Sequence, residues 1–431
     1  MIIEIFKEIT KIPRCSGTYE PFINYVKEFA IKYDYICKID SAKNILCYKK
    51  DKTPKICLQS HYDIVCLEDG KIPQVIESNG YLKAKNSTLG ADNGIGCAYM
   101  LNLMRKGENI ECLFTCDEEV GLIGANNIEH TLQSKYMLNL DSETEGKICI
   151  GCAGGIDIFA TNSNSQIIPN IDNKNLYEIS IDNLDGGHSG VDIDKNIPNA
   201  LKLLAQSIKG CDGDLLDFNG GERINSIPKY AKAIIASNYE PIKVHKNMKI
   251  EKIATKTKHY KKLDSNIIDF IYSFANGVRE YNKEVKVVTT SINLAKIETS
   301  INNVKISLSA RSMDNDKLKL ITDETIVLLK NFGFKVITSG KYPSWKPEKN
   351  RFLKEVLKSY KKFNQNAQFE AIHAGLESAI FKEKYPNIQI GSIGPNIYFP
   401  HSNNEKCEIN SVYNVYKVLE DIIKNINNKG K

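Results

Sequence analysis

Residues 55–63 read KICLQSHYD, a short apolar run that breaks off at a histidine and an aspartate. Two later stretches, ECLFTCDEEVG at 111–121 and YMLNLDSE at 136–143, also pass from an apolar run to carboxylates. Such runs, separated by helical patterns like that of residues 94–104, predict an α/β domain with a mainly parallel sheet and helices on both faces. The polar residues that end the runs include His61, Asp63, Glu118, Glu119 and Asp141.

The same domain is expected to take in both ends of the chain. Residues 1–155 and 344–431 carry the α/β pattern, with strands expected at 56–59, 111–116, 136–140 and 388–393 and helices at 94–104 and 411–426. Residues 156–343 differ, because they contain alternating strand patterns such as 176–181 and 304–310 and a helix near 199–208. We therefore expect an inserted α+β domain there. Its Lys-rich segment 243–262 is expected to be exposed, as a loop or a mobile helix.

The composition is that of an ordinary globular protein. The chain has 431 residues, of which 42% are hydrophobic and 26% charged, which is enough for two cores. The net charge of +6 comes from scattered basic and acidic residues, so a solvated surface is favoured over a nucleic-acid-binding one. No apolar run is long enough to span a membrane. The first residues lack a signal-peptide pattern and predict an amphipathic helix that stops at Pro13.

Twelve cysteines raise the question of disulfides or a zinc cluster. Most stand singly in apolar runs, where a thiol behaves as a small hydrophobic side chain. Cys149 and Cys152 form one CxxC pair, with no second pair to complete a zinc site. We therefore expect reduced cysteines and the reducing environment of the cytoplasm.

Two further stretches carry possible metal ligands. Residues 87–96 (STLGADNGIG) place Asp92 in a Gly-rich turn before a helix, and residues 388–402 (IQIGSIGPNIYFPHS) lead from a strand to His401. Open α/β sheets form their sites beyond the carboxyl ends of the strands, so these imidazoles and carboxylates could meet at one edge. A pair of metal ions about 3.5–4 Å apart needs such a set of ligands.

Each element alone has a plainer interpretation. An HxD sequence is usually a hydrogen-bonded turn, and adjacent acids such as Glu118 and Glu119 most often lie on a solvated face or at a helix start. The GADNGIG turn lacks the spacing of the known phosphate loops, and its aspartate would repel a phosphate. The recurrence of ligand residues at several strand ends nevertheless favours a metal site.

Eight segments resemble the co-catalytic zinc exopeptidases, in particular the aminoacyl-histidine dipeptidases (peptidase D, or cytosolic non-specific dipeptidases). They are SHYDIV (60–65), TLGADNGIGCA (88–98), TCDEEVGLIGA (115–125), NLDSETEGKICIGCAGG (139–155), GGHSG (186–190), ARSMD (310–314), HAGLE (373–377) and SIGPNIYFPHS (392–402). TLGADNGIG, the extended CAGG segment and HAGLE distinguish this branch from the acetylornithine and succinyl-diaminopimelate deacylases. SHYD departs from the more common GHxD at a position that supplies no ligand.

The resemblance implies a metal ligand at each of five matching positions. His61 and Asp141 are expected to bind one zinc ion and Glu119 and His401 the other, with Asp92 bridging the two. Mn²⁺ or Co²⁺ would also suit imidazole and carboxylate ligands.

The resemblance also implies roles around the substrate. Glu118 is expected to be the general base, and Asp63 the carboxylate that orients the His61 imidazole. In the inserted domain, His188 is expected to contact the scissile carbonyl oxygen, and Arg311 with backbone near Gly375 to receive the peptide's carboxylate. Taken alone, Arg311 would be interpreted as a surface ion pair and His188 as a turn residue.

The resulting hypothesis is a cytoplasmic, homodimeric dipeptidase in which two zinc ions activate a water that attacks short peptides, of Xaa-His type or more broadly. The inserted domain is expected to act as a lid and in dimerisation. An alternative is an amidohydrolase of the same superfamily that acts on N-acyl amino acids or tripeptides. A non-catalytic peptide- or metal-binding protein is a further alternative, which the presence of Glu118 and all five ligand residues disfavours. His373 and Glu377 receive no role.

Overall fold

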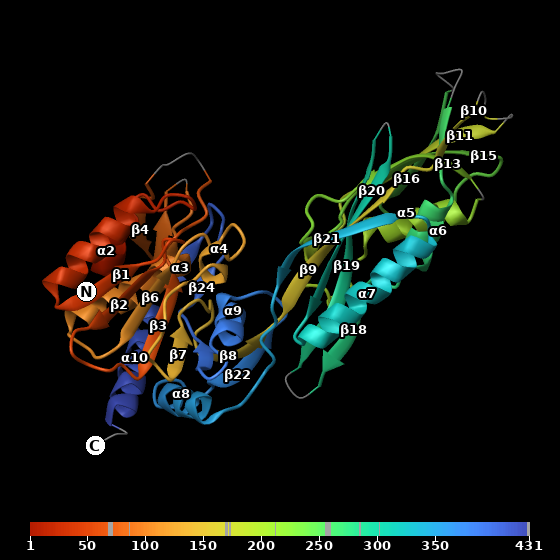
Figure 1. The fold of residues 1–431 in the computed structure, drawn as a ribbon. Helices are drawn as coiled ribbons and strands as arrows, with labels where there is room; N and C mark the ends of the chain where they lie inside the picture. Colours follow the sequence, from red (N-terminus) through yellow and green to blue (C-terminus); the bar gives the residue numbers. More distant parts are fainter. Residues whose placement is uncertain are drawn as a thin grey trace. The chain divides into compact units, whose positions relative to one another are not determined.

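The computed structural model describes residues 1–67, 72–85, 87–168, 171, 174–211, 213–254, 260–283, 286–300 and 302–428. The chain forms two compact units (Figure 1). The first comprises Met1–Cys152, Trp345–Ala371 and Leu376–Lys431, and the second Ala153–Ser344 with Ile372–Gly375. The second unit is thus inserted into the chain of the first. Its role as a lid or in dimerisation stays a prediction.

The segment Ile372–Gly375, which we expected in the first domain, belongs to the second unit. Nε2 of His373 lies 2.7 Å from the hydroxyl oxygen of Ser291. Gly375 lies so close to the ring of Tyr342 that a Cβ at residue 375 would be 2.8 Å from a ring carbon. These contacts join residues far apart in the sequence, so no local pattern could have indicated them.

The first unit is built on an eight-stranded sheet with the strand order β1-β2-β6-β3-β7-β23-β8-β22. The strands are β1 (Tyr35–Ile39), β2 (Ile45–Lys49), β3 (Ile56–His61), β6 (Glu111–Thr115), β7 (Tyr136–Asn139), β8 (Lys147–Cys152), β22 (Gln368–Ile372) and β23 (Gln389–Ser392). β3, β6, β7 and β23 run parallel to one another, which confirms the predicted fold class. Because β3 and β6 are buried along their whole length, each contains a continuous apolar stretch, residues 56–58 and 112–114, rather than an alternating pattern.

Helices cover both faces of this sheet. They are α1 (Ile2–Thr10), α2 (Glu20–Lys32), α3 (Ala91–Arg105), α4 (Ile123–Asn126), α8 (Arg351–Lys361), α9 (Glu377–Lys384) and α10 (Ile409–Asn428). Successive residues of a strand point to opposite faces. Leu58 of β3 joins the hydrophobic core that includes residues of α1, α3, α8 and α10, whereas the amide of Gln59 donates to Glu377 at the start of α9.

A small four-stranded sheet completes the first unit. Its strands are β4 (Val75–Ser78), β5 (Tyr81–Ala84), β24 (Ile397–Tyr398) and β25 (Lys406–Glu408), in the order β24-β25-β5-β4. All three pairings are antiparallel. The pairing of β25 with β5 ties the segment after residue 398 to the chain just before α3.

The second unit is an antiparallel sheet with helices on one face (Figure 1). The main sheet consists of β9 (Gly154–Asn162), β11 (Asn175–Ile181), β13 (Asp214–Gly220), β15 (Ala231–Ser237), β16 (Met248–Ile253), β18 (Gly277–Asn282), β19 (Val287–Thr299), β20 (Val304–Ser312) and β21 (Lys335–Tyr342). The helices are α5 (Ala200–Lys209), α6 (Asn266–Ser273) and α7 (Asn315–Asn331), and their apolar residues share one core with the sheet. Two short pairs add β10 (Ser165–Ile168) with β17 (Tyr260–Leu263) and β12 (Gly187–His188) with β14 (Ser226–Ile227).

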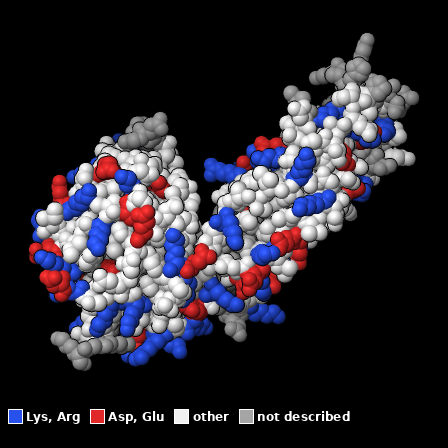
Figure 2. All heavy atoms as spheres, viewed as in Figure 1, with Lys and Arg blue, Asp and Glu red and all other residues white. Residues whose placement is uncertain are grey.

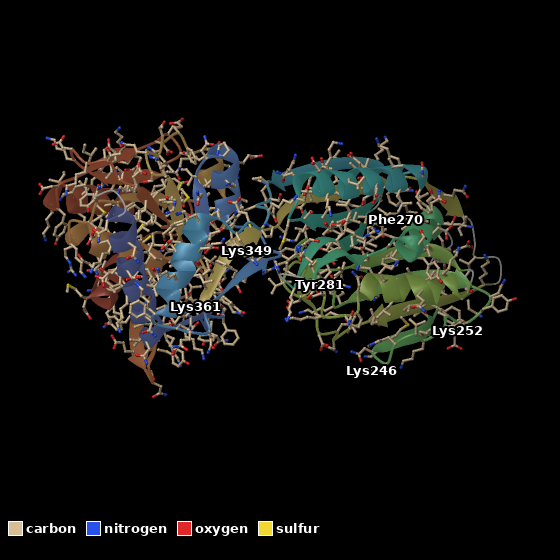
Figure 3. The ribbon with its side chains drawn as sticks, turned by 90° about the horizontal axis from the view of Figure 1, so that it is seen from below. Lys246, Lys252, Phe270, Tyr281, Lys349 and Lys361 are labelled. Atoms are coloured by element: carbon tan, nitrogen blue, oxygen red, sulfur yellow. A yellow bond between two sulfur atoms is a disulfide. The ribbon has the colours of Figure 1, made fainter. Side chains whose placement is uncertain are left out.

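The prediction of a loop or mobile helix at 243–262 was wrong for residues 248–253 and 260–262, which form strands, whereas residues 243–247 lie in no helix or strand. β16 pairs with β11 along its whole length, and β17 pairs with β10. The difference arises because side chains alternate between the two faces of β16, so that Met248 is buried and Lys249 is exposed. Exposed lysines are common on edge strands. Lys246 and Lys252 lie at the periphery of the unit (Figure 3). Residues 255–259 of the segment lie outside the described residues.

The surface carries charges of both signs. On the face seen in Figure 2, lysine and arginine are interspersed with aspartate and glutamate on both units. Within the described part of the chain, no helix is long and apolar enough to cross a lipid bilayer.

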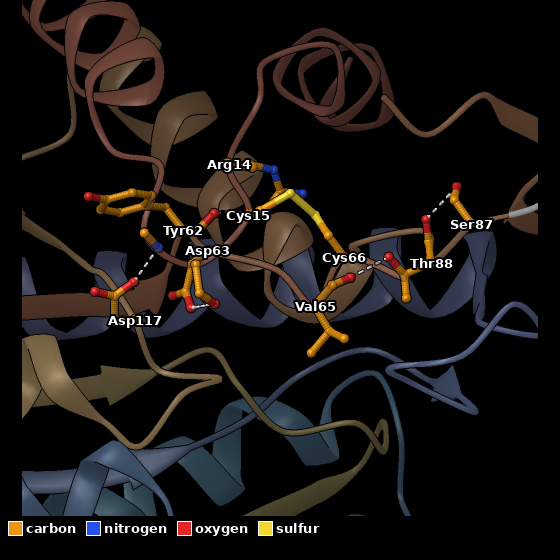
Figure 4. Close-up of a disulfide and its surroundings, with 11 residues drawn as sticks. Arg14, Cys15, Tyr62, Asp63, Val65, Cys66, Ser87, Thr88 and Asp117 are labelled. Atoms are coloured by element: carbon orange, nitrogen blue, oxygen red, sulfur yellow. Dashed lines mark hydrogen bonds between the residues drawn. A yellow bond between two sulfur atoms is a disulfide. The ribbon is translucent and has the colours of Figure 1, made fainter. Parts of the chain in front are cut away.

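The prediction that all cysteines are reduced was also wrong. Cys15 and Cys66 form a disulfide between residues 51 positions apart (Figure 4), and the other ten cysteines are thiols. The two chain segments meet because Cys15 forms a β-bridge with Ile64. This proximity is a property of the fold, and cysteine spacing alone gave no sign of it.

Candidate metal centre

The carboxyl ends of the parallel strands bring the predicted metal ligands to one edge of the sheet. His61 ends β3, Glu119 follows β6 and Asp141 follows β7, whereas His401 lies between β24 and β25, in the segment that follows β23. Parallel strands direct their carboxyl ends to the same edge, which explains this convergence. Asp92 joins them from the start of α3, where its backbone is not yet helical.

These five side chains form two overlapping groups whose possible ligand atoms lie within 4.8 Å of one another: His61, Asp92 and Asp141, and Asp92, Glu119 and His401. Nε2 of His61 is 3.2 Å from Oδ1 of Asp92 and 3.3 Å from Oδ1 of Asp141. Nε2 of His401 is 3.0 Å from both Oδ2 of Asp92 and Oε2 of Glu119. Asp92 therefore faces one imidazole with each of its oxygens, as a carboxylate between two metal ions would.

The donor set fits cations. Oε1 of Glu119 is buried and, among the described residues, has no hydrogen-bond partner. Hydrogen bonds to Asp92 and Glu119 raise the pKa of His401 to about 11. Burial raises the pKa of Glu118 well above its usual range, and the carboxylate of Asp141 adds to this. So many carboxylates crowded into a buried site repel one another unless positive charge is present, and imidazole with carboxylate is a ligand set for Zn²⁺, Mn²⁺ or Co²⁺.

Glu118 lies within the same cluster. Its carboxylate, with His61 and Glu119, forms a third group of possible ligand atoms within 4.8 Å of one another. Glu118 lies in the loop after β6, next to Glu119 in sequence. In space it is close to one member of each of the two groups of possible ligands, His61 and Glu119. The geometry therefore permits Glu118 to act on a molecule bound at the centre.

Asp63 contacts both His61 and the loop after β6. Nδ1 of His61 lies 3.0 Å from the backbone carbonyl oxygen of Asp63 and 3.5 Å from its carboxylate. The carboxylate also accepts hydrogen bonds from the backbone amides of Glu118 and Glu119, at 3.1 and 3.3 Å, and from the hydroxyl of Ser16 at 2.8 Å. That Asp63 orients the His61 imidazole stays a prediction, and its side chain in addition fixes the loop after β6.

Sequence reasoning missed the segment of residues 14–19, which contacts sequence neighbours of the proposed ligands, including Asp63 and Asp117. Figure 4 shows Arg14, Asp63 and Asp117 around the disulfide. The guanidinium of Arg14 is fully buried and donates to the carbonyl oxygens of Tyr62 and Gly90. Asp117, next to Glu118, accepts the amide of Gly17 at 2.7 Å and the hydroxyl of Tyr19 at 2.5 Å. Residues 14–19 have no ligand-like pattern in the sequence, so only their contacts in the fold identify them.

Glu377, which received no role from the sequence, lies at the start of α9 and contacts two strands of the sheet, β3 and β6. It is fully buried and accepts hydrogen bonds from the side chains of Gln59 and Thr115, at 2.6 and 2.8 Å. Burial raises the pKa of Glu377 to about 8.

The remaining predicted residues, His188, Arg311 and Gly375, lie in the second unit. Nη1 of Arg311 donates to the hydroxyl of Tyr342 at 2.7 Å. The ring of Tyr342 covers Gly155 and Gly375, where a Cβ would approach its atoms to 2.5 and 2.8 Å. The glycines of two motifs thus make room for the ring whose hydroxyl holds Arg311.

His188 is held in one tautomer. Its Nδ1 accepts the backbone amides of Gly190 and Val191, at 3.2 and 3.1 Å, so the proton of the neutral ring resides on Nε2. Burial lowers the pKa of His188, and the charge of Arg311 lowers it further. The ring is therefore a neutral donor through Nε2 at neutral pH.

The parallel sheet and the cluster of histidine and carboxylate groups at its edge define a metallopeptidase. The chain belongs to peptidase family M20/M25/M40, whose family model matches residues 57–425.

Similar proteins agree with this. The chain is 32% identical over 473 residues to the cytosol non-specific dipeptidase of Escherichia coli (strain K12), covering 98% of this chain and 97% of that protein. Its structure is similar to that of the aminoacylhistidine dipeptidase of Vibrio alginolyticus, with a TM-score of 0.84, 29% identity and coverage of 98% and 96% of the two chains. A tripeptidase from Staphylococcus aureus shares the fold, with a TM-score of 0.60, 18% identity and coverage of 99% and 97%.

Proposed function

We propose that this chain is a two-zinc dipeptidase that hydrolyses dipeptides held by their free carboxylate. The observation that carries the proposal is the position of Asp92, with one oxygen facing His61 and the other facing His401. That arrangement suits a carboxylate shared by two metal ions. Glu118, in the adjoining group with His61, is the proposed base.

The five ligand residues divide between two ions. His61 and Asp141 would hold one, Glu119 and His401 would hold the other, and Asp92 would be shared by both. When bound, two zinc ions would supply Lewis-acid polarisation of the peptide carbonyl and lower the pKa of a water molecule. Imidazole and carboxylate donors leave Mn²⁺ and Co²⁺ as alternatives, so the metal is part of the test.

The residues around the ions perform the proton transfers. Glu118 accepts a proton from the attacking water and delivers it to the departing amine. Its backbone is held by the carboxylate of Asp63, which limits its movement during both transfers. Nε2–H of His188 is the proposed donor to the scissile carbonyl oxygen, where negative charge develops in the transition state.

Dipeptides are the proposed substrates because the relatives from Escherichia coli and Vibrio alginolyticus are named as dipeptidases. Arg311 supports this choice, since a guanidinium matches a carboxylate with two parallel hydrogen bonds. Arg311 is 7% exposed and its guanidinium is held by Tyr342, so it is already oriented before a peptide binds. Gly375, in the HAGLE motif, is the proposed site of backbone contact.

A cytoplasmic setting is part of the proposal and rests on the name of the Escherichia coli relative, which is called a cytosol dipeptidase. The cysteines no longer support it, because Cys15 and Cys66 are joined. A homodimer is proposed from the family resemblance alone, and sedimentation of the purified protein would test it.

The test is hydrolysis of a peptide panel by metal-stripped protein, with and without added Zn²⁺, Mn²⁺ or Co²⁺. The panel contains β-alanyl-histidine, an alanine dipeptide, the amide of that dipeptide, a tripeptide and an N-acetyl amino acid. We expect zinc to restore cleavage of the dipeptides, with the amide much poorer because it lacks the carboxylate.

Preferred cleavage of the N-acetyl amino acid or the tripeptide would replace the dipeptidase proposal by the amidohydrolase alternative. No cleavage of any substrate by folded protein with any of the three metals would favour a non-catalytic binding protein.

A further inference from the structure

The turn that carries Asp92 is held by a side chain more than 300 positions away. Oε2 of Glu405 accepts the backbone amides of Leu89 and Gly90 at 2.7 and 3.0 Å, and Oε1 accepts those of Ala91 and Asp92 at 2.9 and 3.3 Å. Four consecutive amides thus converge on one carboxylate. Glu405 is 3% exposed, so these bonds offset the cost of burying its charge.

The turn cannot provide this support itself. The first amides of a helix have no partners within the helix and are usually capped by a nearby Ser, Thr, Asp or Asn. Here the N-cap of α3 is Gly90, which has no side chain and adopts a left-handed conformation with φ of 67°. Glu405 takes the place of the missing cap. Arg14 holds the same turn through a carbonyl group, because it donates to the carbonyl oxygen of Gly90 at 2.8 Å.

Glu405 belongs to the same short segment as His401. It lies four residues after His401, and its amide donates to the carbonyl oxygen of Ser402 at 3.1 Å. The next residues, Lys406–Glu408, form β25 and pair with β5. One short segment therefore supplies a proposed ligand, His401, and also holds the turn that presents the proposed bridging ligand, Asp92.

We propose that Glu405 is a positioning residue for metal binding, which holds the turn 89–92 so that Asp92 faces both His61 and His401. The inference rests on the proposed function only in that Asp92 is taken to bridge two ions. Movement of the turn would move Asp92 away from one or both imidazoles, whose Nε2 atoms lie 3.2 and 3.0 Å from its oxygens. Loss of such an outer partner typically weakens metal binding 10–100-fold.

The chain offers a matched control in Glu111. This carboxylate is also fully buried, and it accepts the backbone amides of Gln133 and Ser134 at 2.9 and 3.0 Å. It lies at the start of β6, whereas the proposed ligands lie beyond the ends of the strands. Glu111→Gln and Glu405→Gln therefore both remove the charge of a buried carboxylate that binds backbone amides, but only the second change affects the turn of Asp92.

The experiment measures zinc binding by metal-stripped wild type, Glu405→Gln and Glu111→Gln, in competition with a chromophoric chelator, together with the melting temperature of each. We expect Glu405→Gln to bind zinc about 10–100-fold more weakly than wild type and Glu111→Gln to bind it as wild type does, although both melt lower. Glu405→Asp keeps the carboxylate but withdraws it by one methylene, and we expect an intermediate loss. This variant decides the question if Glu405→Gln does not fold.

Wild-type zinc affinity in the folded Glu405 variants would overturn the inference and leave Glu405 as a helix cap only. Equal weakening in Glu111→Gln would overturn it as well, because general destabilisation would then explain both. If wild type binds two zinc ions but cleaves no peptide, the proposed function fails while the role of Glu405 is still decided by affinity.

Discussion

The carboxylate of Asp63 accepts the backbone amide of Glu118 at 3.1 Å. Asp63, two residues after His61, thus holds the loop that carries Glu118, the proposed base. Since Asp63 follows β3 and Glu118 follows β6, the bond couples the ends of two neighbouring strands. One residue, Asp63, therefore contacts both His61 and the backbone of Glu118.

Replacing Glu118 by Gln should lower kcat by about 10²–10⁴-fold, because an amide of the same shape cannot take a proton from water. Zinc content should stay at the wild-type value if Glu118 is a base and not a ligand. The measurement is kcat for a dipeptide together with zinc per chain. Full activity in a zinc-loaded Glu118→Gln variant would exclude Glu118 as the base, whereas loss of one zinc equivalent would identify it as a ligand.

Tyr342→Phe should weaken binding of dipeptides through Arg311. The change removes one hydrogen bond to a charged group, worth about 1.5–3 kcal/mol, so KM should rise by about tenfold or more while kcat changes less. Dipeptide amides, which lack the carboxylate, provide the control and should respond little. If KM rises equally for acids and amides, the pair Arg311 and Tyr342 does not read the carboxylate.

Reducing the disulfide between Cys15 and Cys66 should destabilise the protein by about 4 kcal/mol on the chain-entropy estimate for a loop of this length. Both residues are half-buried, so a small dithiol can reach them. The measurement is the melting temperature with and without reductant, and Cys15→Ser is the control that should not respond. An unchanged melting temperature in reduced wild type, with both thiols titrated, would contradict the expectation.

Acid should weaken the second unit through His373. Burial, aided by the charges of Arg311 and His188, lowers the pKa of His373 to about 3. The unfolded chain, with a histidine pKa near 6.5, binds the proton first, so the stability contributed above pH 6.5 is lost progressively as the pH falls toward 3.

His373→Gln removes this titration while keeping a partner for Ser291. The measurement compares the melting temperatures of wild type and variant at about pH 7.5 and about pH 5. The difference in melting temperature between wild type and His373→Gln should be smaller at the lower pH. If it stays constant, His373 takes up its proton equally in the folded and unfolded chain.

The fold class and the peptidase family could be predicted from the sequence because both depend on local patterns. β3, β6 and β7 are short apolar runs, and buried parallel strands need such runs. The residues directly after them must lie at one edge of the sheet, which is why the sequence alone suffices to group His61, Glu119 and Asp141. Their assignment as metal ligands stays a prediction.

The sequence was a poorer guide where a residue's role depends on distant partners. The Lys-rich segment was expected to be a loop or helix, but pairing with β11 makes Met248–Ile253 a strand. The disulfide went unpredicted because Cys15 and Cys66 meet only through the bridge to Ile64. Spacing between cysteines carries no information about such a meeting.

By itself, the sequence determined that β3, β6 and β7 are strands and which chemical groups follow them, since apolar runs and the residues at their ends are local features. The tertiary structure alone decided what those groups touch. Glu405 looks like an ordinary loop glutamate until the fold buries it against the amides of residues 89–92. Asp63 likewise shows its bond to Glu118 only once β3 and β6 lie side by side. A buried polar group must find partners wherever the folded chain provides them, and those partners need not be near in sequence.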